Sequence, residues 1–335
     1  MLPYNRRDAL RTFANGFGMI GLANVLFQDS RAAADNPLAV KTPHFPAKAK
    51  RVIFLFMSGG PSHVDTFDPK PKLAEMNGKP LPFEQPKLVR TKTSNLLQSP
   101  FKFKKHGDSG IEVSELFPQV ATCIDDLCVI RGMYADNINH NGACLQMNTG
   151  EQAFSRPSLG SWLLYGLGSA NRNLPGFVVL SPAQPAQGAP LWSSSFLPAA
   201  LQGTLVADVN KPIDNLPATG ANLDRQRAQL DALKALNALH RDRRQDDSAL
   251  AARIESFELA YRMQKEAPEA FNLTKETAET RKLYGLDDKT TEIFGKQCLL
   301  ARRLAERDVR CIQVYHTATS KRSSCQLWDQ HGGLK

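Results

Sequence analysis

The sequence predicts an α/β fold in which a doubly wound parallel sheet carries helices on both faces. Short apolar runs rich in β-branched and aromatic residues alternate with segments of helical periodicity, an order typical of βαβ units. Each run is nearly continuous in apolar residues, as expected for strands buried on both sides. A chain of 335 residues with 42% hydrophobic and 22% charged residues can bury a sizeable core for such a domain.

Four apolar runs predict the strands, at residues 51–57, 127–130, 176–180 and 309–315. Their brevity and their β-branched content favour strands over helices. Helical spacing of apolar residues predicts the helices, at residues 117–126, within 139–150, and at 159–167, 223–265 and 291–307. Residues 72–115 are rich in Pro, Lys and Gly and predict irregular surface with short elements.

A long excursion from the sheet is predicted at about residues 183–290. Its first part, up to residue 222, is rich in Ala, Pro, Gly, Gln and Ser, which predicts loops that pack over a site. Its second part is helical because leucines recur on one face with charges on the other. Pro268 is expected to end that helix, since proline removes a backbone hydrogen-bond donor.

The first 34 residues predict a twin-arginine signal peptide, which leaves residues 35–335 as the folded domain. Arg6 and Arg7 precede an uncharged, mostly apolar run at 13–26, and three alanines follow as a cleavage site. The predicted partner is the twin-arginine translocation machinery, and the predicted location is periplasmic or secreted. The apolar run is too short to span a bilayer comfortably, so no stable membrane span is expected after processing. The alternatives are an ordinary amphipathic helix and a retained anchor.

The chain is basic, with 42 Lys and Arg against 33 Asp and Glu, so 42 − 33 gives a net charge of +9. These charges are scattered, and their short runs lack the interleaved aromatic residues of a nucleic-acid surface. We therefore expect no nucleic-acid partner but a preference for an anionic substrate. The six cysteines form no CxxC pair, so most are expected to be small buried residues.

Candidate site residues follow the predicted strands, at the sheet edge where parallel strands end. They comprise Ser58, Gly59, His63, Asp65 and Asp68 after the first strand; Asp136, Asn139, His140 and Asn141 after the second; and His316, Asp329 and His331 after the last. Carboxylates and imidazoles are the usual ligands of Zn²⁺ or Mn²⁺ in hydrolytic sites. The pattern therefore predicts a divalent metal site that acts on an anionic ester.

Each local motif also has a plainer interpretation. Asp329 and His331 share one face of an extended chain, or they belong to a solvated loop. The helix start at 139–142 binds an anion through its backbone N–H groups, or Asn139 is an ordinary helix cap. Ser58 and Gly59 bring the backbone close to a phosphate or sulfate, or they form a tight turn after a strand.

Several blocks of sequence, in order, resemble one known family. They are FLFMSGGPSHVDTFDPKP at 54–71, LCVIRGMYADNINHNGACLQMNTG at 127–150, CLLARRLAERDVRCIQVYH at 298–316 and WDQHGGLK at 328–335. With the export signal, these blocks resemble domain-of-unknown-function family 1501, exported bacterial proteins of the alkaline phosphatase and sulfatase-like superfamily. The resemblance implies an alkaline-phosphatase-like fold and, by analogy, metal-dependent hydrolysis of phosphate or sulfate esters. The implied cofactor is a divalent metal, Zn first, with Mn, Mg or Ca as alternatives.

The resemblance also implies roles for single residues. His140 stands where the superfamily carries its nucleophile, so it is the expected catalytic residue, as a metal ligand or an unusual nucleophile. Asp65, Asp329 and His331 are the expected metal ligands. Ser58, Gly59, Asn139 and Asn141 are the expected substrate-binding residues.

Two further expectations follow from the superfamily comparison. Its remaining ligands would lie beyond Lys335, so the domain is expected to be C-terminally truncated and weakly active or inactive. The alternative function is a non-catalytic periplasmic binding or scaffold protein that retains the hydrolase fold.

Overall fold

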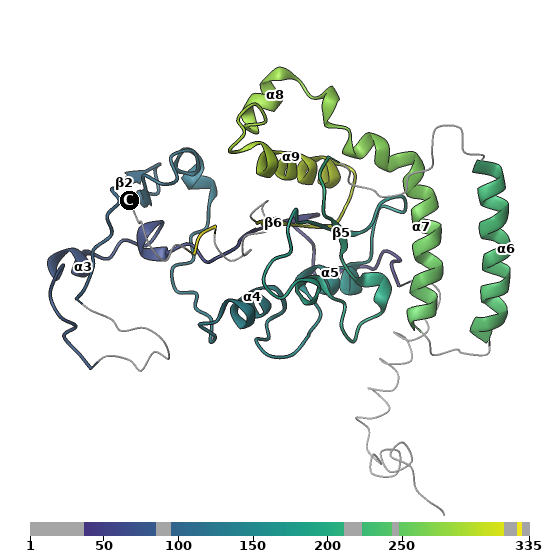
Figure 1. Cartoon of the computed structure of the whole chain (residues 1–335), viewed down its shortest axis with the longest axis horizontal. Helices are drawn as coiled ribbons and strands as arrows, with labels where there is room; N and C mark the ends of the chain where they lie inside the picture. Colours follow the sequence, from purple (N-terminus) through teal and green to yellow (C-terminus); the bar gives the residue numbers. More distant parts are fainter. Residues whose placement is uncertain (1–36, 85–94, 211–222, 243–247, 318–326, 330–335) are drawn as a thin grey trace, which may run out of the picture.

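The computed structural model describes residues 37–84, 95–210, 223–242, 248–317 and 327–329. The predicted signal peptide and His331 lie outside these residues. A four-stranded sheet with the order β1-β6-β4-β5 forms the centre of the protein (Figure 1). All three strand pairings in it are parallel. Its strands are β1 (Val52–Met57), β4 (Phe177–Leu180), β5 (Thr204–Val206) and β6 (Cys311–His316).

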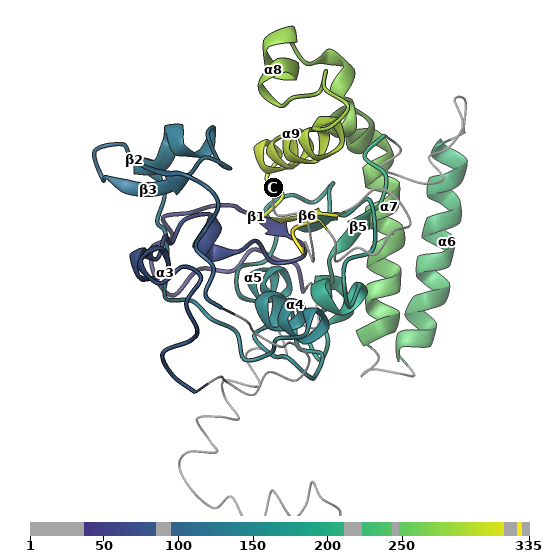
Figure 2. The same cartoon turned by 60° about the vertical axis from the view of Figure 1, so that its left-hand side comes forward.

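Helices cover both faces of the sheet, which confirms the predicted α/β class. On one face lies α9 (Glu292–Glu306), with the end of α7 (Ser248–Phe271); on the other lie α4 (His140–Thr149) and α5 (Leu159–Leu167) (Figures 1 and 2). Alternate residues of each central strand enter opposite cores. Ile312 and Val314 pack toward α9, whereas Cys311 and Tyr315 pack toward α4 and α5.

The prediction that the first strand is fully buried is wrong. Strand β1 forms where expected, but Ile53, Leu55 and Met57 are 42%, 52% and 37% exposed. The reason is position, because β1 is an edge strand paired only with β6 among the described residues. The apolar face of α9 packs mainly over β6, so these three side chains of the edge strand remain half uncovered.

The predicted strand at 127–130 does not form. This segment leaves the 3₁₀ helix η2 (Val120–Asp126) without joining any described sheet, and Leu127 and Ile130 are 40% and 64% exposed. A strand needs a hydrogen-bonding neighbour, which an apolar run alone does not supply. The helix predicted at 117–126 is likewise shorter than expected, and a non-helical φ of −121° at Cys123 interrupts it.

An antiparallel hairpin lies within the segment predicted as irregular. It pairs β2 (Phe103–His106) with β3 (Ile111–Ser114), beyond the short helix α3 (Pro71–Glu75). The hairpin and η2 share a small core of Val113, Ala121 and Ile124, which we call the satellite core. The carboxylate of Asp125 accepts the backbone N–H groups of Asp108 and Ser109, both at 2.9 Å. These bonds fix the hairpin turn against η2.

The predicted excursion contributes to the main body of the protein. Strand β5 lies inside it and pairs with β4, and 3₁₀ turns precede it at η3 (Ala189–Trp192) and η4 (Ala199–Leu201). Helix α6 (Leu223–Asp242) packs on the outer side of α7, away from the sheet (Figure 1). Arg227 joins the two helices through Glu258, with nitrogen–oxygen distances of 2.8 and 2.9 Å.

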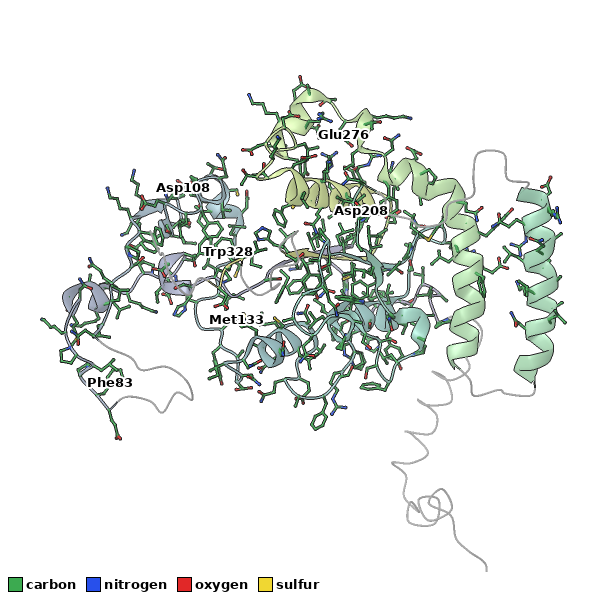
Figure 3. All side chains as sticks on the ribbon, viewed as in Figure 1. Phe83, Asp108, Met133, Asp208, Glu276 and Trp328 are labelled. Carbon is green, nitrogen blue, oxygen red and sulfur yellow. The ribbon has the colours of Figure 1, made fainter. Side chains whose placement is uncertain are left out.

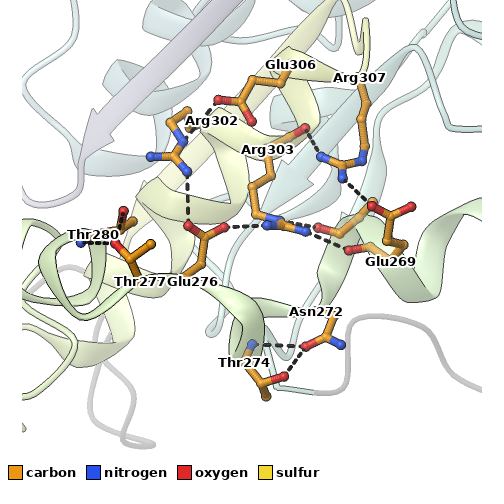
Figure 4. Close-up of polar contacts among 11 residues, drawn as sticks. Glu269, Asn272, Thr274, Glu276, Thr277, Thr280, Arg302, Arg303, Glu306 and Arg307 are labelled. Carbon is orange, nitrogen blue, oxygen red and sulfur yellow. Dashed lines mark hydrogen bonds and ion pairs between the residues drawn. The ribbon is translucent and has the colours of Figure 1, made fainter.

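Pro268 does not end its helix, contrary to the prediction. Helix α7 continues through it to Phe271, because Ala267 and Ala270 are fully buried beside α9. Arg303 of α9 donates to the Ala270 carbonyl at 2.9 Å and to the Glu269 carbonyl at 2.8 Å (Figure 4). Tertiary packing and these two bonds hold the last turn that the proline weakens.

The link from α7 back to α9 is held by ion pairs. It contains η5 (Leu273–Lys275) and α8 (Ala278–Leu283). Glu276, whose side chain is 9% exposed, contacts Arg303 and lies 3.2 Å from Arg302 (Figure 4). None of the described helices combines the length and apolar composition needed to cross a membrane. Of the five cysteines that the structure describes, only Cys144 and Cys311 are buried, whereas Cys123 and Cys128 are exposed, so the expectation that most are buried does not hold for these five.

Candidate functional site

The chain leaves β1 through a turn that exposes its backbone. Gly59 and Gly60 have φ angles of 102° and 74°, values that favour glycine because it lacks a Cβ atom. Ser58 is 3% exposed, and its Oγ atom has no hydrogen-bond partner among the described residues. Buried hydroxyls are normally satisfied, so an orphaned one at a strand end indicates a place where a further polar group fits.

In the loop after this turn, one carbonyl oxygen accepts several backbone hydrogen bonds. The His63 carbonyl accepts the N–H groups of Thr66, Phe67 and Asp68 at 3.2, 3.2 and 3.0 Å. The buried Asp68 carboxylate lies 2.6 Å from Lys70 Nζ. The hydrogen bond from Lys70 lowers the pKa of Asp68, which keeps the carboxylate ionised at neutral pH.

His316 ends β6 directly beside Met57 of β1. Its Nδ1 atom accepts the indole N–H of Trp328 at 3.1 Å. An indole nitrogen only donates, so Nδ1 carries no proton in this arrangement and the ring is neutral. Burial lowers the pKa of His316, which also favours the neutral ring. The ring also packs against Phe294, with centroids 4.8 Å apart.

Helix α4 begins at the predicted loop with His140 as its first residue. Asn139 is the helix cap, since its side-chain oxygen accepts the Asn141 N–H at 3.0 Å. The contact of Asn139 is therefore that of an ordinary helix cap. Substrate binding by Asn139 and Asn141 stays a prediction. A Cβ atom at Gly142 would lie 2.2 Å from the side-chain nitrogen of Asn137, so any larger residue here would displace that side chain.

The central contact of the site joins two predicted residues that are far apart in sequence. His140 Nε2 lies 2.9 Å from Asp329 Oδ2, with side chains 40% and 23% exposed. An ionised carboxylate only accepts hydrogen bonds, so Nε2 carries a proton, and in the neutral ring Nδ1 keeps its lone pair. This arrangement orients an imidazole for use as a base or a metal ligand.

Other predicted ligands are not part of this contact. Asp65 lies in the short η1 turn (His63–Asp65), and within the described ranges no three His, Cys, Asp or Glu side chains gather closely enough to hold a metal ion. His331 lies outside the described residues. Imidazole and carboxylate are donors that Zn²⁺ or Mn²⁺ accepts, so metal binding by His140 and Asp329 stays a prediction.

Trp328 is the site residue that the sequence did not single out. Its indole stacks on Phe117, which packs against the satellite core, with centroids 5.7 Å apart and planes 8° apart, while its N–H donates to His316. Its backbone N–H also donates to the Ser58 carbonyl at 3.4 Å. Figure 3 shows Trp328 between the hairpin and the sheet. A large aromatic directly before the candidate ligand Asp329 was the available signal.

A pocket of about 280 Å³ opens beside this group. Its walls include Met57, Phe67, Phe117, Ile130 and Met133, together with the ionised Asp68. Most of the wall is therefore apolar, although it lies next to a polar site. The residues that failed to form the second strand thus contribute to the pocket.

Comparison with known proteins gives one match. Residues 49–335 match the family model described as "Protein of unknown function (DUF1501)". No curated protein and no solved structure matches the chain.

Proposed function

The chain belongs to the DUF1501 family, and from its own site we propose that it is an exported, metal-dependent hydrolase of phosphate or sulfate esters. The single observation that carries this proposal is the contact between His140 and Asp329, whose side chains lie 2.9 Å apart. They are 189 positions apart in sequence, yet both lie at the edge where β1 and β6 end.

The electrostatics of the site suit an anionic ester. Asp329 faces the N-terminus of α4, where the helix dipole and free N–H groups favour negative charge. A second anion at this edge would face the same helix end and a protein of net charge +9. The glycine turn after Ser58 leaves its backbone open to such a group.

The proposed chemistry assigns a role to each residue. Asp329 holds the imidazole of His140 in one tautomer, so that Nδ1 can take a proton from the attacking water. Ser58 and Gly59 position the ester. A divalent cation held by His140 and Asp329 would supply charge that polarises the phosphoryl or sulfuryl oxygen.

Export belongs to the same proposal. The paired arginines, apolar run and alanines of residues 1–34 support a twin-arginine signal peptide. Folding before translocation would allow the metal to be bound before export, so a metalloenzyme suits this route. Protease protection of the chain in intact cells, compared with an Arg6→Lys/Arg7→Lys variant, tests it. Equal accessibility of the two forms would contradict export by this pathway.

The metal site is tested by measuring zinc and manganese in the full chain by plasma mass spectrometry. We expect near-stoichiometric metal in the wild type and its loss in His140→Ala and Asp329→Asn. The matched controls are His44→Ala and Asp126→Asn, which change exposed residues away from the contact. Each variant is also screened for hydrolysis of phosphate and sulfate esters.

The outcomes separate the two functions considered from the sequence. Metal and turnover that are both lost in the two site variants support the hydrolase. Metal that is bound without turnover supports the binding protein on a hydrolase fold. Equal metal content in the wild type, site variants and controls overturns the proposed site.

A further inference from the structure

The pocket beside Trp328 combines features that point to an organic ligand. Its volume of about 280 Å³ lies at the small end of ligand pockets, which span roughly 300–1,000 Å³. Phe67 and Phe117 pack in its wall with centroids 5.1 Å apart. Met57 and Met133 add polarisable thioethers, which make favourable contacts with aromatic rings.

The mouth of the pocket is apolar and uncovered. Ile130 and Met133 are both 64% exposed, and Met57 is 37% exposed. Exposed apolar side chains are ordinary when scattered, but here they surround one concavity, which is typical of a binding site. Such side chains contribute hydrophobic contact area for a ligand but do not fix the orientation of the ligand.

The polar part of the wall is already balanced. Asp68 is held ionised by Lys70, and Arg131 and His63 are close enough to lower its pKa further. Arg131 also lines the pocket, so its positive charge offsets that of the Asp68 carboxylate, whose pairing with Lys70 leaves little charge to attract a cation. The pocket therefore suits an uncharged, planar apolar group.

Two contacts join the pocket to the proposed active site. Phe117 lines the pocket and stacks on Trp328, whose neighbour Asp329 contacts His140. Met57 also lines it and directly precedes Ser58. Because Met57 and Ser58 are consecutive, the pocket lies next to a residue that is proposed to position the ester.

We propose that this pocket binds the aromatic alcohol group of the substrate, so that the chain prefers aryl esters. This substrate class rests on the proposed function, whereas binding of an arene in the pocket does not. A group of phenyl to naphthyl size matches the volume of the pocket.

The test uses isothermal titration calorimetry on the full chain with three probes: 2-naphthol, 2-naphthyl phosphate and inorganic phosphate. We expect 2-naphthol to bind the wild type, and 2-naphthyl phosphate to bind at least about tenfold more tightly than phosphate. Ile130→Trp fills the mouth and should weaken both naphthyl probes by about tenfold or more while sparing phosphate. Met133→Trp is the second blocking variant, and Ile138→Trp, 76% exposed and away from the pocket, is the matched control.

The results distinguish the pocket from the proposed function. No binding of 2-naphthol, or binding that both blocking variants leave unchanged, overturns the inference even if phosphate binds. Equal affinity for 2-naphthyl phosphate and phosphate overturns the aryl-ester preference and leaves the hydrolase standing. Naphthol binding lost in the blocking variants supports the pocket, even where absent phosphate binding counts against the hydrolase.

Discussion

Strands β4 and β6 lie between two helical layers, whereas β2 and β3 cover one side of a core with three fully buried residues. All four residues of β4 are buried, and so are the first five of β6. In the hairpin only Val113 and Ser114 reach that state. The difference shows that the two sides of the candidate site are supported unequally.

Stability should therefore be unevenly distributed. Local opening costs little where few apolar contacts are lost. The sheet side holds His316 at the end of β6 and Ser58 directly after β1, while the other side depends on Phe117 and the stacked Trp328. The pocket lies where the two sides meet, so its shape should depend on the weaker one.

The largest expected effect is the unequal response of the two cores to truncation. Leu300→Ala removes a fully buried side chain between α9 and the sheet and should lower the free energy of unfolding by about 2–5 kcal/mol. Ile124→Ala in the satellite core should instead speed amide exchange at residues 103–114 and barely move the main unfolding transition. Hydrogen exchange and denaturant titration of both variants check this. An equal shift of the main transition would show that the two cores unfold together.

The second largest loss of stability is expected from a buried polar cluster on the sheet side of the site. Asn148 Oδ1 accepts from Gln313 Nε2 at 2.5 Å and from the Tyr315 hydroxyl at 2.8 Å. Asn148→Ala leaves two buried donors unpaired and should cost about 2–4 kcal/mol of stability. The control Tyr315→Phe removes one donor and keeps the other bond, so it should cost about 1 kcal/mol. Equal costs in denaturant titration would contradict a shared acceptor.

The third effect concerns the contact between the two sides. Trp328→Ala removes the stack on Phe117 and the hydrogen bond to His316, so it should cost about 1–3 kcal/mol. It should also speed exchange in the hairpin and weaken naphthol binding in the pocket. Trp328→Phe keeps a ring for stacking and should retain most of the pocket affinity. Unchanged exchange in Trp328→Ala would show that the hairpin is held by other contacts.

Elements whose evidence is local were predicted well from the sequence. Helices α5 and α9 and strand β4 formed within about a residue of expectation, because periodicity and length are properties of the segment itself. The predictions that were wrong concern contacts between segments that lie far apart in sequence. The exposure of β1, the unpaired 127–130 segment and the continued helix at Pro268 each depend on what packs beside them.

The site shows the same division. His140 and Asp329 were placed at one sheet edge, and the structure joins them, although the strand at 127–130 that was expected to precede His140 does not form. Asp65 shared the same sequence signal, but its short turn does not bring it into a metal-capable group among the described residues. The role of Trp328 needed the satellite core, which sequence patterns did not reveal because its contacts join separate segments.

The smallest effect is a pH dependence at the same junction. Burial lowers the pKa of His316 below its ordinary 6.5, so the unfolded chain takes up the proton first. Stability from the neutral ring is present above pH 6.5 and falls as the pH drops below that value. Protonation of Nδ1 also removes the acceptor for the Trp328 N–H. Unfolding midpoints followed by tryptophan fluorescence between about pH 5 and pH 8 should therefore fall more steeply in the wild type than in His316→Gln. Parallel dependence of the two unfolding midpoints on pH would show that protonation of His316 does not control the stability of this junction.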